Sequence, residues 1–228
     1  MSSNTESSSC AGNDPVIDHD DPTECQARQK AEEILLAVKQ QRGDGSSNDG
    51  EVEDDDANGN RSDILERAQE LKQQGNKYFN EKEWEEAIKY YTLAIDIHPE
   101  ESTYYSNRSV CYVQLKLYTE ALHDAIVAQT LNPTWSKAYY RIAMSRYELK
   151  KYKLAALAAY QGLYYLQHQQ QHQQHKGKSP TNSTTDKKSR EELKRILRTC
   201  AQHARQEYQQ KKKNMTSETS TEAQNDDP

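Results

Sequence analysis

The chain has 228 residues, of which 33% are hydrophobic and 29% charged, and its mean hydropathy of −1.16 is that of a very polar protein. Such a composition cannot supply one compact core over the whole length, and it leaves room for about one domain with polar flanks. The net charge of −6 is unevenly spread, because residues 64–168 hold 12 acidic and 13 basic side chains. This balance argues against a nucleic-acid-binding domain, which would be strongly basic.

Residues 1–61 form an acidic region that we expect to be mostly disordered. Residues 1–60 contain 15 Asp and Glu against 4 Lys and Arg, and such segments bury too little apolar surface to fold. The exception is a short helix expected at 22–42, where Pro22 suits a first helical turn. An apolar stripe follows it, made of Ala27, Ala31, Ile34, Leu35 and Val38. Because so short a helix is marginal in isolation, it either docks or frays.

A period of 34 residues runs through residues 62–167, which we assign to one repeat domain. Small residues recur at this spacing in three series, namely Ala87, Ala121 and Ala155; Ala94, Ala128 and Gly162; and Gly75, Ser109 and Ala143. Pro99 and Pro133 share the spacing and end helical stretches, since proline cannot continue a helix. Self-similarity at one period indicates stacked structural units. We place the three repeats at 68–101, 102–135 and 136–169.

Each repeat is expected to form two helices, with its aromatic residues in the core. In the first repeat Leu71, Gly75 and Tyr78 share one face of a first helix. Apolar residues from Trp84 to Ile97 mark a second helix. Small residues stand where the paired helices approach closely. The fold class predicted is therefore all-α: a superhelix of three helical hairpins with a C-terminal capping helix and disordered flanks.

The C-terminal part supplies the cap that a repeat array needs. Residues 168–188, rich in Gln, His, Lys and Ser, are interpreted as a low-complexity insertion. Residues 189–213 are predicted to form the capping helix, because apolar residues recur there at helical spacing from Leu193 to Tyr208. Residues 214–228 are expected to be a disordered tail.

This pattern resembles the tetratricopeptide repeat (TPR), over residues 68–166 and the cap. Three strings resemble more closely the carboxylate-clamp subclass of co-chaperones, such as a TPR domain of the Hsp70/Hsp90-organising protein: LKQQGN at 71–76, YSNRS at 105–109 and KAYYR at 137–141. The resemblance implies binding of the acidic Glu-Glu-Val-Asp tails of Hsp70 and Hsp90 chaperones. It also implies five clamp residues, which are Lys72, Asn76, Asn107, Lys137 and Arg141.

The spacing of these five residues is compatible with a common groove. Lys72 and Asn76 are four residues apart and share a helical face, as do Lys137 and Arg141. Asn107 and Arg141 are 34 apart and occupy equivalent positions in neighbouring repeats, whose first helices line one surface. Amides can donate to a terminal carboxylate, while Lys and Arg neutralise acidic groups. The alternative is that these are ordinary solvated charges. By the same resemblance, flanking peptide subsites are formed by Phe79, Val110, Val113, Gln114 and Tyr147, some of which are equally compatible with the core.

The function predicted is that of a non-enzymatic co-chaperone adaptor, with no cofactor and no metal. The alternative is a scaffold subunit that binds an internal peptide segment of another protein. Four dispersed cysteines suggest neither disulfides nor a zinc site, and the longest apolar stretch is too short for a bilayer. We therefore expect a monomer in the cytoplasm, or also the nucleus, without nucleic-acid or membrane partners. The histidines at 168, 172 and 175 are interpreted as part of the low-complexity segment. The acidic run 51–56 is interpreted as solvated sequence, with the alternative that it binds the basic groove as an internal decoy.

Overall fold

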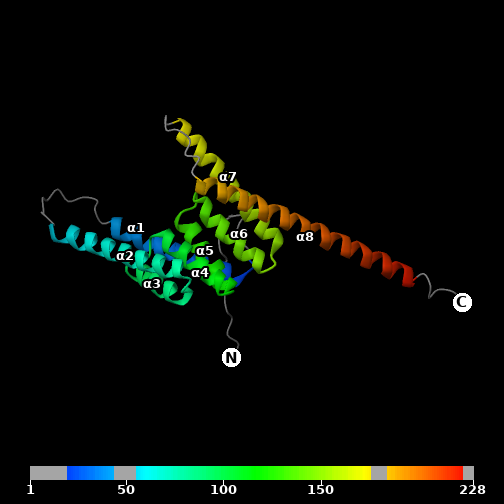
Figure 1. Cartoon of the computed structure of the whole chain (residues 1–228), viewed down its shortest axis with the longest axis horizontal. Coiled ribbons are helices and arrows are strands. Elements are labelled where there is room, and N and C mark those ends of the chain that lie inside the picture. The colour runs from blue at the N-terminus through cyan, green and yellow to red at the C-terminus, as the bar shows by residue number, and fades with distance from the viewer. Residues whose placement is uncertain (1–19, 44–54, 176–183, 223–228) are drawn as a thin grey trace, which may run out of the picture.

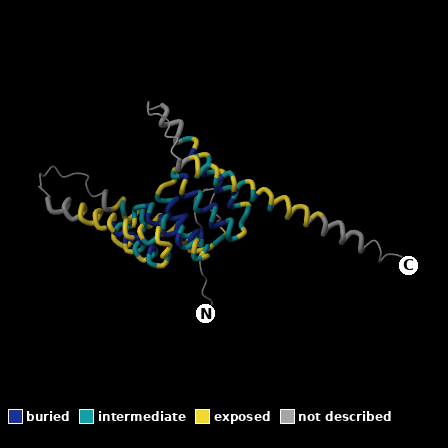
Figure 2. Tube along the Cα trace, in the orientation of Figure 1, coloured by how far each residue is buried: buried dark blue, intermediate teal, exposed yellow. Residues whose placement is uncertain are grey.

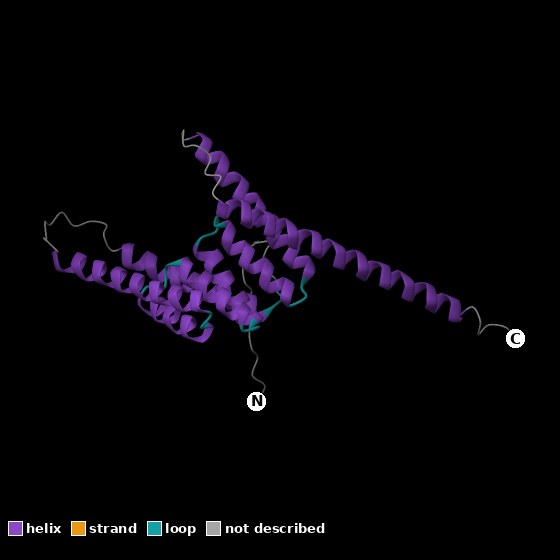
Figure 3. Cartoon of the chain, in the orientation of Figure 1, coloured by secondary structure: helices purple, strands orange, loops and turns teal. Residues whose placement is uncertain are grey.

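The computed structural model describes residues 20–43, 55–175 and 184–222, and within these ranges every regular element is a helix. Figure 1 shows the chain as a stack of helices from which α7 and α8 project, and Figure 3 shows that short loops join them. The helices are α1 (Pro22–Gly43), α2 (Asp55–Glu81), α3 (Trp84–Ile97), α4 (Ser102–Gln114), α5 (Tyr118–Leu131), α6 (Ser136–Glu148), α7 (Tyr152–His175) and α8 (Thr184–Glu222).

Three helical hairpins make the body of the protein, as the 34-residue period predicts. The pairs α2–α3, α4–α5 and α6–α7 are each in extensive contact, and α8 packs on α7 as a cap. The small residues of one series, Ala87, Ala121 and Ala155, are completely buried. The two helices of each hairpin approach so closely at these positions that only a side chain as small as that of alanine or glycine fits. The predicted fold class of three stacked hairpins with a capping helix is confirmed, and Figure 2 places the buried residues in the middle of the stack.

The turns inside the three hairpins share one geometry. Lys82, Lys116 and Lys150, which are 34 residues apart, all have positive φ angles of 62–64°. In the first turn the Lys82 N–H donates to the Phe79 carbonyl and the Glu83 N–H donates to the Tyr78 carbonyl. The other two turns repeat these bonds. This is the Schellman arrangement at a helix end, in which glycine is the usual left-handed residue.

The N-terminal helix α1 docks on the repeats. It packs mainly on α5, the second helix of the second hairpin, with Ala27 and Ala31 completely buried. Its far half borders a groove of about 610 Å³ with the start of α2 and the α3–α4 turn. The helix predicted for residues 22–42 is thus part of the folded body.

Several element boundaries differ from the sequence-based ones. Helix α2 begins at Asp55, inside the region expected to be disordered, and α7 runs to His175, inside the expected insertion. The cap α8 spans Thr184–Glu222 and extends beyond 189–213 at both ends, so it takes in part of the expected tail. A physical reason is the absence of proline, since none lies between Pro22 and Pro99, between Pro133 and Pro180 or between Pro180 and Pro228. The acidic run 51–56, named above as a possible decoy, lies mostly outside the described residues, and residues 1–19, 176–183 and 223–228 lie wholly outside them.

A buried ion pair ties the hairpins together. Arg108 on α4 donates from Nε and Nη2 to the two carboxylate oxygens of Asp124 on α5, at 2.7 and 2.8 Å. Its Nη1 donates to the Thr92 hydroxyl on α3 at 2.9 Å. Because both charged groups are almost fully buried, each depends on the other for compensation.

Candidate peptide-binding site

The five residues singled out as a clamp lie on the first helices of the three hairpins. Lys72 and Asn76 are on α2, Asn107 is on α4, and Lys137 and Arg141 are on α6. The spacing argument required this distribution, because stacked first helices line one surface of a repeat array.

The two amides lie side by side. The Asn76 Oδ1 accepts a hydrogen bond from the Asn107 amide at 3.3 Å and another from the Tyr91 hydroxyl at 2.8 Å. With its oxygen engaged in this way, the Asn76 amide nitrogen is oriented as a donor. Tyr91 can reach Asn76 because residue 75 is glycine: a Cβ there would lie 2.7 Å from the tyrosine ring.

The two cations of α6 form an electropositive pair. Burial lowers the pKa of Lys137, and the nearby Arg141 guanidinium lowers it further. Burial also lowers the pKa of Arg141. The Arg141 Nε is buried and, among the described residues, has no hydrogen-bond partner. A buried N–H of a charged group without an acceptor is costly.

A carboxylate stands near this pair without neutralising it. Glu192, on the capping helix α8, attracts the Arg141 charge but interacts directly with the Tyr140 hydroxyl. Burial and this carboxylate raise the pKa of Tyr140 to about 12. The structure gives no ion pair between Arg141 or Lys137 and a carboxylate within the described ranges. The pair is therefore suited to an anion from outside.

Each of the three cations also faces an aromatic ring. The Lys72 Nζ lies 6.0 Å from the ring centre of Tyr104, and the Lys137 Nζ lies 5.8 Å from that of Trp135. The Arg141 guanidinium carbon is 5.2 Å from the Tyr140 ring. At such distances the rings attract cations weakly, so they help to hold the long side chains in place.

Cys111 of α4 is hydrogen-bonded to the Asn107 backbone and is within electrostatic range of Arg141. Its thiol donates to the Asn107 carbonyl at 3.5 Å, and the positive charge of Arg141 acts to lower the pKa of this thiol. Burial raises the pKa of this thiol to about 12, so it is a neutral packing group. Asn76 and Asn107 are thus in direct contact, Arg141 acts electrostatically on Cys111 of the same helix as Asn107, and Lys72 reaches α4 through Tyr104.

The residues predicted to flank the clamp have mixed environments. Phe79 packs edge-on against Trp84, beside the small cluster that contains Tyr91 and Cys111. Tyr147 packs against Tyr152 of α7 and His203 of α8. The remaining three lie on α4, where Val110 and Val113 are half-buried and Gln114 is exposed. Their role in peptide binding remains a prediction.

Sequence reasoning missed the residues that orient the clamp. Tyr91 fixes the Asn76 amide, and Glu192 of the capping helix α8 acts on the charge of Arg141. The available signal for Tyr91 was its 34-residue equivalence to Ala125 and Ala159, which marks it as the one large residue of its series. No signal of period or motif pointed to Glu192.

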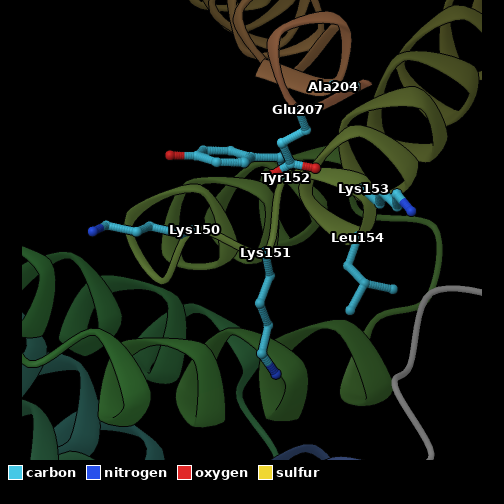
Figure 4. A pocket seen from close by; sticks show the side chains of 7 residues that line it. All are labelled: Lys150, Lys151, Tyr152, Lys153, Leu154, Ala204 and Glu207. Carbon is cyan, nitrogen blue, oxygen red and sulfur yellow. The ribbon is translucent and has the colours of Figure 1, made fainter. Parts of the chain in front are cut away.

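No other centre competes with this site in the described part of the chain. Within those residues no cluster of His, Cys, Asp and Glu could hold a metal ion, and no helix is long and apolar enough to cross a bilayer. A cavity of about 300 Å³ between α7 and α8 (Figure 4) is lined by other residues, among them Lys150, Tyr152 and Glu207.

Comparisons with known proteins agree with the repeat fold. Residues 33–143 match the family model described as "Serine/threonine-protein kinase BSK1-like, TPR repeats". The chain is 45% identical over 97 residues to human serine/threonine-protein phosphatase 5, a match that covers 42% of this chain and 19% of the relative. It is 37% identical over 98 residues to the Hsp70-Hsp90 organizing protein of Triticum aestivum, covering 43% and 17%.

Among solved structures, the Sgt2 TPR domain from Aspergillus fumigatus superimposes with a TM-score of 0.50 at 27% identity, over 62% of this chain and 82% of that one. The chain matches less than a fifth of the length of the curated relatives, and the similarity to phosphatases is confined to their repeats. Taken with the three stacked hairpins, these similarities show that the repeat domain of this chain is similar to the tetratricopeptide-repeat domains of co-chaperones.

Proposed function

We propose that the surface formed by α2, α4 and α6 binds the free C-terminal end of an acidic peptide, and that its ligand is the Glu-Glu-Val-Asp tail of Hsp70- or Hsp90-type chaperones. In this proposal the protein is a co-chaperone adaptor and carries out no catalysis. The clamp consists of Lys72, Asn76, Asn107, Lys137 and Arg141.

The observation that carries the proposal is the unpaired Arg141 Nε beside the Lys137 ammonium. Arg141 is partly buried and Lys137 is exposed beside it, and neither forms an ion pair with a carboxylate in the described ranges, so each disfavours the other's charge. An incoming carboxylate would relieve this cost and give Arg141 the forked acceptor that its geometry suits. The free protein thus keeps its cations ready for an anionic ligand.

The other residues provide the geometry for a chain end. The Asn76 amide, with its oxygen already used, has N–H groups to give to one carboxylate, and the Asn107 amide stands next to it. Lys72 adds a third positive charge. A peptide that ends in Asp presents two carboxylates a few ångströms apart, so the paired amides and the paired cations can each receive one.

The relatives are consistent with this assignment. The matched region of the wheat relative belongs to a protein named Hsp70-Hsp90 organizing protein, and yeast heat shock protein STI1 is 45% identical over 76 residues. The proposal carries this chaperone connection over to the present chain, and with it a location in the cytoplasm.

The test is a titration of the full chain with a peptide ending in Glu-Glu-Val-Asp. We expect micromolar affinity, about −8 kcal/mol, that weakens as salt screens the charges. Arg141→Ala should cost roughly 2–5 kcal/mol, because it removes one partner of a largely desolvated charge pair. Lys137→Ala should cost less, because Lys137 is exposed. Lys77→Ala is the matched control, since Lys77 is an exposed lysine of α2 and should leave the affinity unchanged.

The same peptide with an amidated C-terminus separates the two candidate functions. A carboxylate clamp loses most of its affinity for the amidated peptide. A scaffold that binds an internal segment is indifferent to amidation. Equal binding of both peptides, or equal binding by wild type and Arg141→Ala, would defeat the clamp.

A further inference from the structure

One position of the repeat departs from its equivalents in the third hairpin. Tyr78 and Tyr112 occupy this position in the first two repeats, and Arg146 occupies it in the third. The Arg146 side chain is completely buried at the end of α6. A fully buried guanidinium needs a carboxylate and several acceptors.

The N-terminal helix supplies that carboxylate. Glu24 of α1, also completely buried, accepts from the Arg146 Nε at 3.1 Å and forms a second, shorter bond with its Nη2. The Arg146 Nη1 donates to the Leu154 carbonyl of α7 at 3.4 Å. The pair therefore joins α1, α6 and α7, across 122 positions of sequence.

A second ion pair stands beside the first. Lys151, in the α6–α7 turn, binds Asp21 just before α1 begins and lies 3.8 Å from Glu24. Figure 4 shows the Lys151 side chain pointing away from Tyr152 and Glu207. Although burial would raise the pKa of Asp21, hydrogen bonds with Lys151 and Thr23 and the Lys151 charge lower it overall, so this carboxylate stays ionised at neutral pH.

The apolar packing of α1 fits the same interpretation. Where the first repeat has Tyr91, the second and third have Ala125 and Ala159, both completely buried. The small side chains of Ala27 and Ala31 on α1 are buried in the same core cluster. Helices with small residues at their contact can approach closely, and Ala27 and Ala31 are the small residues that α1 buries against the repeats.

Helix α6 links this junction to the candidate peptide site. Arg146 follows Arg141 by five residues, about 7.5 Å along the helix at 1.5 Å per residue. One short helix thus carries the two clamp cations on one side and a buried cation that depends on α1 on another. A change in how Arg146 is held would shift or loosen the helix that presents Lys137 and Arg141.

We propose that Glu24 is a positioning residue for the peptide groove: by holding Arg146, helix α1 fixes α6 in the place where its two cations meet the ligand. The inference rests on the proposed function for its ligand, and on the Glu24–Arg146 pair for its geometry. Residues 20–43 are accordingly part of the smallest unit that binds peptide with full affinity.

The experiment compares full-length variants by peptide titration. Glu24→Gln leaves Arg146 buried without its counter-charge, and we expect the affinity for the Glu-Glu-Val-Asp peptide to fall about tenfold. Glu32→Gln is the matched control, because it breaks the exposed Arg28–Glu32 pair on the same helix and should change nothing. In an Arg141→Ala background Glu24→Gln should cost threefold or less. An equal loss in both backgrounds, or no loss in the wild-type background, overturns the proposal.

Two further measurements keep the result decisive. If Glu24→Gln unfolds, the double variant Glu24→Gln/Arg146→Tyr is measured, because it removes both buried charges and restores the residue type of the first two repeats. Near wild-type affinity of the double variant supports a role of the pair in holding α6. A double variant that folds but does not bind overturns that role. If the wild type binds no peptide, the proposed function fails by itself. Amide hydrogen exchange then decides the α1 inference: Glu24→Gln should speed exchange in residues 136–148 but not in 84–97, and unchanged exchange in 136–148 refutes it.

Discussion

At Gly75 both the packing of α2 on α3 and the orientation of Asn76 depend on the absence of a Cβ atom. Replacing it with alanine should gain about 1 kcal/mol of helix propensity in the interior of α2. The new Cβ, however, would lie 2.7, 2.8 and 3.0 Å from three ring atoms of Tyr91. This ring is only 1% exposed and is held by its bond to Asn76, so it has little room to move. Overpacking of this kind costs up to about 3 kcal/mol, which leaves a net destabilisation of about 2 kcal/mol.

The assay is thermal and urea unfolding of Gly75→Ala, followed by circular dichroism. At 2–4 °C per kcal/mol for a domain of this size, we expect the midpoint to fall by about 5 °C, with weaker peptide binding because Asn76 loses its orientation. Gly162→Ala is the comparison, since a Cβ there would meet Leu193 and the Tyr139 Cβ at the longer distances of 3.2–3.3 Å and should cost less than Gly75→Ala. If Gly75→Ala is as stable as the wild type, or more so, the argument from close approach is wrong.

Three more predictions concern the core, the turns and the pH dependence of binding. Asp124→Asn should destabilise the protein by about 3–5 kcal/mol in urea unfolding, because it leaves Arg108 buried without its counter-ion; a loss below 1 kcal/mol would contradict this. Lys116→Gly should stabilise it by about 1 kcal/mol by relieving the left-handed conformation, and a lower midpoint in thermal unfolding would show that the turn is unstrained. Since the pKa of Lys137 is lowered, the free groove loses this proton below the ordinary lysine pKa of about 10.4, so peptide affinity should fall as pH rises through that lowered value. Lys137→Arg should keep its affinity over the same range, and identical pH profiles of the two proteins would rule out Lys137 as the titrating group.

The part of the fold that follows from local rules was predictable from the sequence. The 34-residue recurrence of small residues fixes where helices pair, and the prolines at 99 and 133 mark where second helices end. The first helices of the hairpins follow from the same period. This is enough to place Lys72, Asn76, Asn107, Lys137 and Arg141 on three neighbouring helices, because position within a repeat determines the face of the helix.

Contacts between distant segments were not predictable in the same way. The pairing of Glu24 with Arg146 joins residues 122 positions apart, and nothing periodic connects α1 to the repeats. Arg146 differs from Tyr78 and Tyr112, which occupy the equivalent positions of the first two repeats. This difference alone does not indicate which carboxylate pairs with the arginine. The helix ends at Asp55, His175 and Glu222 were missed for another reason: composition suggested disorder, whereas polar residues without proline are compatible with helix.

Helix α8 has two halves with different surroundings. Up to Cys200 its apolar residues are buried against the repeats, and beyond that point its described side chains are exposed apart from His203 (Figure 2). From Cys200 to Glu222 the helix would extend about 33 Å at 1.5 Å per residue. The end of α8 at Glu222 therefore projects from the repeats, and a fluorophore attached near that end would report bending of the helix by energy transfer to a second fluorophore on the repeats.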